Sequence, residues 1–420
     1  MTVGESLDGL LRRWWDQHAP GAAARAAIRV VDVEVIRLGR PGLVDVVAEM
    51  DGRLGHAVLA IFGPKDRLRL LGTVEEPTLG TVEDADGAGI VADALHDADA
   101  VRLLLEAVEG RSPAARPRGR RAVSVVRDDA EAIVLAVDRR VTLTVFPWLA
   151  RGPHPGMALL AGLDEAGFNH LAAPIAFWRR AGRDLGVVQE LLAGASSGWA
   201  LAMSSLRDLI ASGVPPQDAG GDFAAESFAL GTMTARMHVA LDRAFGRRTG
   251  DVVAWVDAVG RGLNAAGPNG RRDAGLLEEL RRSGLHPPTI RTHGDFHLGR
   301  TARTDHGWVL ADSMPGGTAE GSEEPVYRSP LADVADFTRS LHHAAAVATA
   351  ERGPVSAHAR LGDLAAAWEA RNRRAFVAAY LATPGIGGLV PADRRVVRRL
   401  LGLFELALAA RYRQSPRGAA

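Results

Sequence analysis

The residue types best suited to chemistry lie in two short segments of the second half of the chain. Residues 293–300 read HGDFHLGR and residues 308–312 read WVLAD, so Asp295 and Asp312 are 17 positions apart with a turn predicted between them. Phosphoryl transfer uses such a pair, because one carboxylate orients the acceptor hydroxyl and takes its proton while another holds the Mg²⁺ that bridges the phosphates. Taken alone, the HGD triplet fits a surface loop with a structural histidine better than it fits an active site.

The composition excludes several other kinds of chemistry. The chain of 420 residues carries 50 Lys+Arg and 50 Asp+Glu, which argues against broad binding of nucleic acid or anionic membranes. It has no cysteine, which excludes thiolate catalysis and Cys-type zinc sites and suits a reducing cytoplasm. Lys65 is the only lysine, so it alone could act as a Schiff-base or phosphate-binding lysine. No secretory segment or membrane span is predicted, and we expect a cytoplasmic protein that is a monomer or a weak homodimer.

The order of elements predicts an α+β protein in three parts. Residues 1–111 are expected to form an N-terminal cap subdomain, because 28–38, 42–50 and 54–62 are β-rich runs split by turn signals and 92–110 follows a helical pattern. Residues 112–195 begin with a Pro/Arg-rich linker and continue as an antiparallel β lobe. From Trp199 onward the apolar residues follow the helical period, so residues 196–420 are expected to form a mostly helical lobe with two short strands.

Together these elements and motifs resemble the aminoglycoside-phosphotransferase-like kinases and, more narrowly, the actinobacterial maltokinases. Their catalytic loop reads HGDLHLGQ where this chain has HGDFHLGR, and their later Asp corresponds to Asp312. Residues 329–340 resemble the family's SPLRDVAGMLRS helix, and residues 198–208 resemble its DGWALA…SLRD helix. The resemblance runs over nearly the whole chain. It implies a bilobal protein-kinase-like fold with a small N-terminal antiparallel cap sheet.

The resemblance also implies an ATP- and Mg²⁺-dependent phosphorylation of a sugar hydroxyl. Asp295 would be the catalytic base and contact the sugar, Asp312 would hold the metal, and Arg300 would lie at the substrate. The nucleotide would contact the β lobe, where the expected residues are Gln189, Glu190, Leu192, Ser124 and Thr144. Other polar residues are expected to brace the loop or to pair a helix with it: His293, His297, Asp333 and Arg339.

Several departures from the family bear on activity. Kinases of this group pair a lysine on the third strand of the β lobe with a glutamate on the next helix, but Thr144 and Ala158 stand at those positions here. Arg300 stands where the family has a Gln or Asn metal ligand, and a guanidinium cannot bind Mg²⁺. Either Arg300 and a first-lobe arginine such as Arg139 or Arg140 supply the missing positive charge, or the chain is a catalytically silent pseudokinase that only binds its ligands. Retention of both aspartates favours an active enzyme.

The last predicted helix bears on the substrate. Matching Arg411-Tyr412 to the Arg-Tyr of the family's last helix places Glu405 where maltokinases carry a lysine near their sugar. A carboxylate there suits a sugar with an ammonium group. A branch of this family phosphorylates glucosamine, and the chain looks closer to that branch, so we expect conversion of D-glucosamine to glucosamine 6-phosphate. Maltokinase and aminoglycoside phosphotransferase activities stay open as alternatives.

Overall fold

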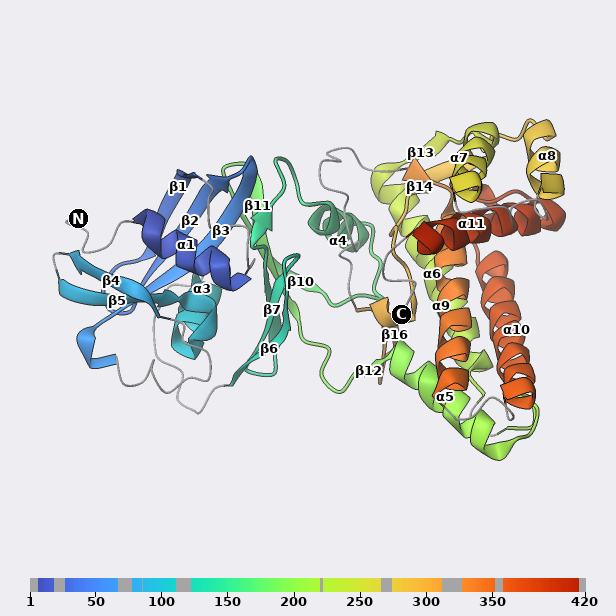
Figure 1. Ribbon diagram of the computed structural model, residues 1–420, viewed down its shortest axis with the longest axis horizontal. Coiled ribbons are helices and arrows are strands. Elements are labelled where there is room, and N and C mark those ends of the chain that lie inside the picture. The colour runs from blue at the N-terminus through green and yellow to red at the C-terminus, as the bar shows by residue number, and fades with distance from the viewer. Residues whose placement is uncertain are drawn as a thin grey trace. The chain divides into compact units, whose positions relative to one another are not determined.

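The computed structural model describes residues 7–18, 27–66, 78–84, 86–110, 122–219, 222–265, 274–311, 327–351 and 358–414 (Figure 1). The chain divides into two compact units. The first unit comprises Met1–Met157 and Ala173–Ala193, and the second comprises Ala158–Ala172 and Gly194–Ala420. The domain boundaries that the sequence suggests at residues 111 and 195 remain predictions.

The first unit begins with an antiparallel sheet whose strands follow the order β1-β2-β3-β5-β4, with β9 paired to β3. Helix α1 (Leu7–His18) buries Trp14 and Trp15 in the same apolar cluster as residues of this sheet. Gly55 on β3 is required by this packing, because a Cβ atom there would lie 2.1 Å from the Trp15 ring. The strand bounds are β1 Ile28–Arg37, β2 Gly42–Met50, β3 Arg53–Phe62, β4 Thr78–Asp84, β5 Gly87–Asp93 and β9 Trp148–Leu149, and the 3-10 helix η1 spans Pro64–Asp66.

The segment 92–110 forms several elements, so the single helix predicted from its sequence is wrong. Strand β5 ends at Asp93, a 3-10 helix η2 spans Ala94–His96, and helix α3 spans Ala98–Val108. The Asp93 carboxylate accepts a hydrogen bond from Leu95 N–H at 2.8 Å, and the Asp97 carboxylate caps the first turn of α3. Each aspartate satisfies free backbone N–H groups at a helix start, so each one begins a new helix.

A second antiparallel sheet in the first unit has the strand order β10-β11-β8-β7-β6. Its strands agree with the predicted β lobe, and the turn between β7 and β8 contains Asp138 and Arg139, both with positive φ. The bounds are β6 Val123–Asp128, β7 Ile133–Val137, β8 Val141–Val145, β10 Pro174–Arg180 and β11 Arg183–Glu190. Helix α4 (Pro155–Glu165) contributes to both units.

The second unit is mainly helical, as the apolar periodicity predicts. Its helices are α5 Gly198–Ser212, α6 Ala224–Phe245, α7 Val252–Ala265, α8 Ala274–Arg282, α9 Pro330–Ala350, α10 His358–Ala382 and α11 Arg394–Gln414, with 3-10 helices η4 Leu298–Arg300 and η6 Ile386–Gly388. Short strands form two small sheets of order β12-β15-β16 and β13-β14-β17. Their bounds are β12 Ser196–Ser197, β13 Arg247–Thr249, β14 Pro288–Arg291, β15 Thr301–Thr304, β16 Gly307–Leu310 and β17 Tyr327–Arg328.

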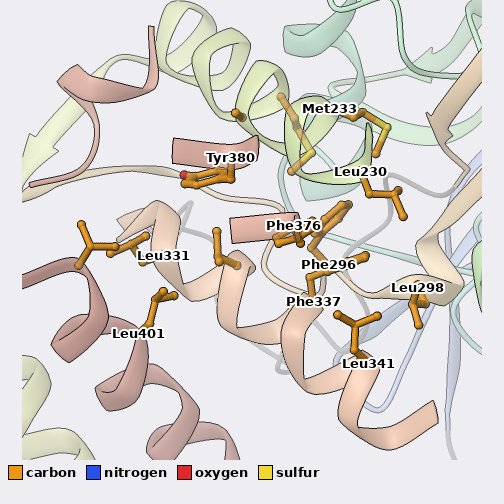
Figure 2. Packing of buried hydrophobic residues seen from close by; sticks show 14 of the residues in the cluster. Leu230, Met233, Phe296, Leu298, Leu331, Phe337, Leu341, Phe376, Tyr380 and Leu401 are labelled. Atoms are coloured by element: carbon orange, nitrogen blue, oxygen red, sulfur yellow. The ribbon is translucent and has the colours of Figure 1, made fainter. Parts of the chain in front are cut away.

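The core of the second unit contains a stack of three aromatic rings (Figure 2). Phe337 on α9 stacks on Phe376 of α10 with 4.1 Å between ring centroids, and on Phe296 of the HGD segment at 5.5 Å. All three side chains are fully buried. The HGD segment is therefore anchored in the core by its own phenylalanine.

Among the helices that the structure describes, none combines the length and the apolar character needed to cross a membrane.

Candidate active site

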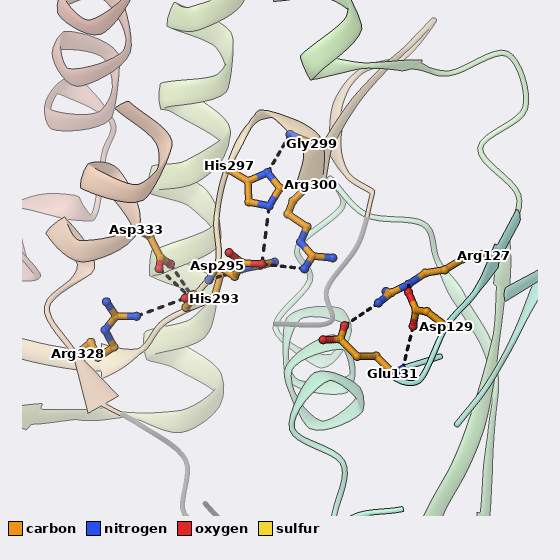
Figure 3. A network of polar contacts seen from close by, with 11 residues as sticks. Arg127, Asp129, Glu131, His293, Asp295, His297, Gly299, Arg300, Arg328 and Asp333 are labelled. Atoms are coloured by element: carbon orange, nitrogen blue, oxygen red, sulfur yellow. Dashed lines mark hydrogen bonds and ion pairs between the residues drawn. The ribbon is translucent and has the colours of Figure 1, made fainter. Parts of the chain in front are cut away.

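The HGD segment is a sharp turn that follows strand β14 and leads into η4 (Figure 3). Gly294 has φ +86°, in the left-handed region that a side chain disfavours, so glycine suits this position. The backbone N–H of Asp295 donates to His293 Nδ1 at 3.3 Å, and that of Gly299 donates to His297 Nδ1 at 3.1 Å. Both histidines thus brace the loop, as expected from the sequence.

The loop is tied to helix α9 by a buried carboxylate. Asp333, which is fully buried, accepts hydrogen bonds from the backbone N–H groups of His293 at 2.8 Å and Gly294 at 2.9 Å. Burial alone would raise the pKa of Asp333, but the hydrogen bond from His238 and nearby positive charge lower it. The helix-to-loop pair predicted for Asp333 is confirmed.

Asp333 is itself held by a chain of buried hydrogen bonds that the sequence did not indicate. His238 on α6 places Nε2 3.1 Å from the Asp333 carboxylate and Nδ1 2.8 Å from the hydroxyl of Tyr380 on α10. The tautomer of His238 that donates from Nε2 to Asp333 can accept a hydrogen bond from the Tyr380 hydroxyl at Nδ1. Burial raises the pKa of Tyr380, so its hydroxyl stays a donor. Helices α6, α9 and α10 thus hold the loop together.

The Asp295 carboxylate points at the side chains of Arg300 and His297. Its Oδ2 is 2.7 Å from an Arg300 amino nitrogen and 3.7 Å from His297 Nε2. Burial by itself would raise the pKa of Asp295, but the interactions with His297 and Arg300 outweigh it and hold the pKa well below its usual range. Asp295 is therefore ionised at neutral pH and can accept a hydrogen bond from an acceptor hydroxyl.

Arg300 lies at the end of η4, close to the catalytic loop. Its side chain is only 14 % exposed, and its backbone carbonyl accepts from Ala311 N–H at 2.8 Å, next to the end of β16. The guanidinium orients the Asp295 carboxylate and supplies positive charge where the resemblance expects a metal ligand. The structure thus joins Arg300 to Asp295, and the contact of either residue with a substrate stays a prediction.

The sheet register places most of the predicted nucleotide residues on one face. Ser124 pairs with Ala136, Ala136 with Thr142, and Thr142 with Gln189. Directly paired side chains share a face, and residues two apart on a strand do so as well, so Thr144 lies on this face too. Most side chains on this face are small, because the row of paired residues contains Ser124, Ala136 and Thr142.

The segment that leaves this sheet carries the remaining nucleotide residues. Glu190 ends β11 and its N–H donates to Ala173 O, while Leu191 N–H donates to Arg140 O, both at 2.9 Å. The Leu191 bond extends the register of β8 to Arg140, which therefore shares the face of Thr144. Leu192 follows directly. Nucleotide contacts of these residues remain predictions.

Glu405 lies in a different setting from the one the sequence suggests. Its carboxylate is 2.6 Å from an Arg373 nitrogen and accepts from Thr338 Oγ1 at 3.3 Å. Thr338 is five positions after Asp333, about 140° around helix α9, so Glu405 contacts a different face from the one that holds the loop. Its role toward the sugar stays a prediction.

The predicted metal ligand Asp312 and the segment that follows it, up to residue 326, lie outside the described residues. Within the described ranges no group of three His, Asp or Glu side chains could hold a metal ion. Of the two predicted catalytic aspartates the structure describes Asp295, whose carboxylate is paired with Arg300.

The fold is the α+β, aminoglycoside-phosphotransferase-like fold, as predicted. No protein-family model matches the chain. A glucosamine kinase of Streptacidiphilus jiangxiensis is 30% identical over 339 residues, which cover 73% of this chain and 70% of that protein. A glucosamine kinase of Mycolicibacterium smegmatis is 29% identical over 322 residues, 70% of this chain and 76% of the relative. The chain belongs to the glucosamine kinase family.

The solved structures agree on the fold. A glucosamine kinase in complex with glucosamine, ADP and inorganic phosphate has a TM-score of 0.65 at 21% identity, over 98% of this chain and 94% of that one. A second crystal of a glucosamine kinase has a TM-score of 0.64. The similarity spans both units, including the first sheet of the first unit.

Proposed function

We propose that this protein is an ATP-dependent kinase that transfers the γ-phosphoryl group to O6 of D-glucosamine. The observation that carries the proposal is the ionised Asp295, held at the tip of a buried, three-helix-anchored loop in a chain of this family. The primary hydroxyl is the least hindered acceptor on the sugar.

Asp295 acts on the acceptor hydroxyl. Its carboxylate accepts a hydrogen bond from O6–H and orients the oxygen toward the γ-phosphorus. As the new P–O bond forms and the bond to ADP breaks, the O6 proton passes to Asp295. A base with a lowered pKa takes the proton late, which fits the loose transition state of phosphoryl transfer. Arg300 keeps the carboxylate oriented between turnovers.

ATP is proposed to lie on the sheet face that carries Ser124, Thr144 and Gln189. Thr144 is buried and neutral where a lysine is common in such kinases. Arg140 shares its face and is exposed, so we propose that it supplies part of the missing positive charge on the phosphates. Mg²⁺ would be bound through Asp312, and its chemistry would be neutralisation of the phosphate charge.

The second candidate function is a silent binding protein, and the observation that favours it is the joint loss of the lysine and glutamate at Thr144 and Ala158. The two functions are separated by incubating the protein with ATP and a panel of glucosamine, glucose, maltose and kanamycin while measuring ADP release. The phosphorylated position is assigned by ³¹P–¹H NMR.

Asp295→Asn is the matched control for that assay. We expect it to lower kcat by roughly 10²- to 10⁴-fold, the range for loss of a positioned base, with little change in nucleotide affinity. Turnover of maltose or kanamycin in preference to glucosamine would replace the proposed substrate. Nucleotide binding without ADP release on any sugar would favour the silent protein.

A further inference from the structure

Helix α9 runs alongside the catalytic loop and contacts it at successive points. Asp333 holds the start of the loop through His293 and Gly294, and Ser340 Oγ accepts from the backbone N–H of Leu298 at 3.1 Å. Between these two anchors Phe337 stacks on Phe296 (Figure 2). The helical turn between Asp333 and Ser340 therefore lies beside the part of the loop that carries Asp295.

Asp336 lies in this turn. It is three positions after Asp333 and four before Ser340, so it shares the side of α9 that faces the loop. Its Oδ2 atom is buried and has no hydrogen-bond partner within the described part of the chain. A buried carboxylate oxygen without a partner is costly, so this atom marks a place where a donor is expected.

Charged groups from three other elements act on Asp336. Burial and the charge of Asp333 raise the pKa of Asp336 to about 7, against the opposing influence of Arg328 on β17 and Arg411 on α11, while Asp295 in the loop adds a smaller upward shift. The two arginines do not neutralise the carboxylate fully, because its pKa stays high. Near neutral pH Asp336 is thus partly protonated, and a cation that binds beside it would lower its pKa and favour the ionised carboxylate.

We propose that Asp336 is the specificity-determining carboxylate that receives the ammonium group of the amino sugar. The inference rests on the proposed function and extends it to the recognition of the amine. An ammonium group supplies both the missing hydrogen bond to Oδ2 and the positive charge that a buried carboxylate needs. Glu405 is less suited to this role, because Arg373 of α10 already balances its charge. Glu405 also contacts α9 at Thr338, on a different face of the helix from the one that holds the loop.

The proposal predicts a pH dependence with a definite sign. A bound cation favours the ionised carboxylate, so binding of glucosamine releases a proton from Asp336 below about pH 7. The preference for glucosamine over glucose therefore rises as pH increases through about 7, and falls again where the sugar amine loses its own proton. Glucose, which has a hydroxyl in place of the amine, shows neither effect.

The test compares kcat/KM for glucosamine and glucose in the wild type, Asp336→Asn and the matched control Glu405→Gln. Asp336→Asn is expected to reduce the preference for glucosamine by roughly 10- to 150-fold, the worth of a charge-assisted hydrogen bond, and to abolish its rise with pH. Glu405→Gln is expected to retain both. An equal loss on both sugars in Asp336→Asn, or a loss of preference in Glu405→Gln alone, would overturn the assignment.

Calorimetry of the wild type separates this inference from the proposed function. Glucosamine is titrated in buffers of different ionisation enthalpy, which reports proton release without any variant or turnover. Proton-releasing binding without phosphorylation would support Asp336 and overturn the kinase proposal. Turnover of glucosamine without proton release near pH 6 would overturn Asp336 alone, and absence of both binding and turnover would overturn both.

Discussion

Replacing Asp336 by asparagine should stabilise the folded protein relative to the wild type, and the gain should grow as pH rises. The pKa of Asp336 is about 7 in the folded protein against an ordinary value of 3.8. Between these values the unfolded chain has released the proton while the folded chain still holds it, so wild-type stability falls as pH rises through this window. Asparagine carries no titratable proton, and the variant escapes this loss.

The magnitude follows from the same values. A difference of about 3 pH units at about 1.36 kcal/mol each amounts to about 4 kcal/mol once the pH exceeds 7. Between pH 5 and pH 8 about two units fall inside the window, so the difference in unfolding free energy between variant and wild type should grow by about 2.7 kcal/mol. Comparing the two pH values removes any constant effect of the substitution itself.

The assay is urea unfolding of both proteins at pH 5 and pH 8, with the midpoint and slope of the transition converted to free energy. Asp363→Asn, at an exposed position of α10, is the matched control and should show the same difference from wild type at both pH values. A difference for Asp336→Asn that does not change with pH would refute the raised pKa and the reasoning built on it.

Three other substitutions test the remaining parts of the site. Arg300→Met removes a partner that lowers the pKa of Asp295, so the acid limb of the pH profile of kcat/KM should move to higher pH; an unmoved limb would mean that Asp295 is not the group that titrates. Arg140→Ala should raise KM for ATP by roughly tenfold, the worth of one phosphate contact of about 1.4 kcal/mol, whereas Arg139→Ala at the adjacent turn should not; equal effects would reject the face assignment. Asp312→Ala should abolish the dependence of ATP binding on Mg²⁺ in calorimetry, and unchanged coupling would place the metal elsewhere.

Regular patterns account for most of what the sequence predicted of the fold. Strands such as β2 and β3, with their alternating or continuous apolar runs, were predicted within a few residues, and the helical period of the apolar residues predicted that the second unit is mainly helical. Strands β4 and β5 were missed because their sequences carry little β propensity: β5 depends on pairing with β3, and β4 depends on pairing with β5. The short strands β13 and β17 likewise exist through pairing with β14.

The residues of the candidate site that belong to a sequence motif were predictable. The residues that reach the site through contacts between distant helices were not. The HGD motif identified Asp295, and the following helix segment identified Asp333. The partners His238 and Tyr380 are 142 positions apart, on helices that the sequence treats as ordinary apolar elements. A histidine on the apolar side of a helix, and the i,i+3 acids Asp333 and Asp336 on an otherwise apolar one, were signals that could have been used.

Sequence also could not show which carboxylates are already paired. Glu405 was chosen by alignment of one helix, yet its charge is balanced by Arg373 from α10. Asp336 differs from it only through the three-dimensional arrangement of its neighbours.

The way Asp333 holds the catalytic loop determines which positions of the loop tolerate substitution. Asp333 holds the start of the loop through the backbone N–H groups of His293 and Gly294, which every residue type except proline provides, so these two contacts do not depend on the side chains at those positions. Change is costly at Gly294 for its backbone conformation, at Asp333 for its two accepted bonds, and at Phe296 for its buried ring stack. A substitution at Arg300 would therefore leave the anchors at Asp333 and Phe296 in place and change only the side-chain partner of Asp295.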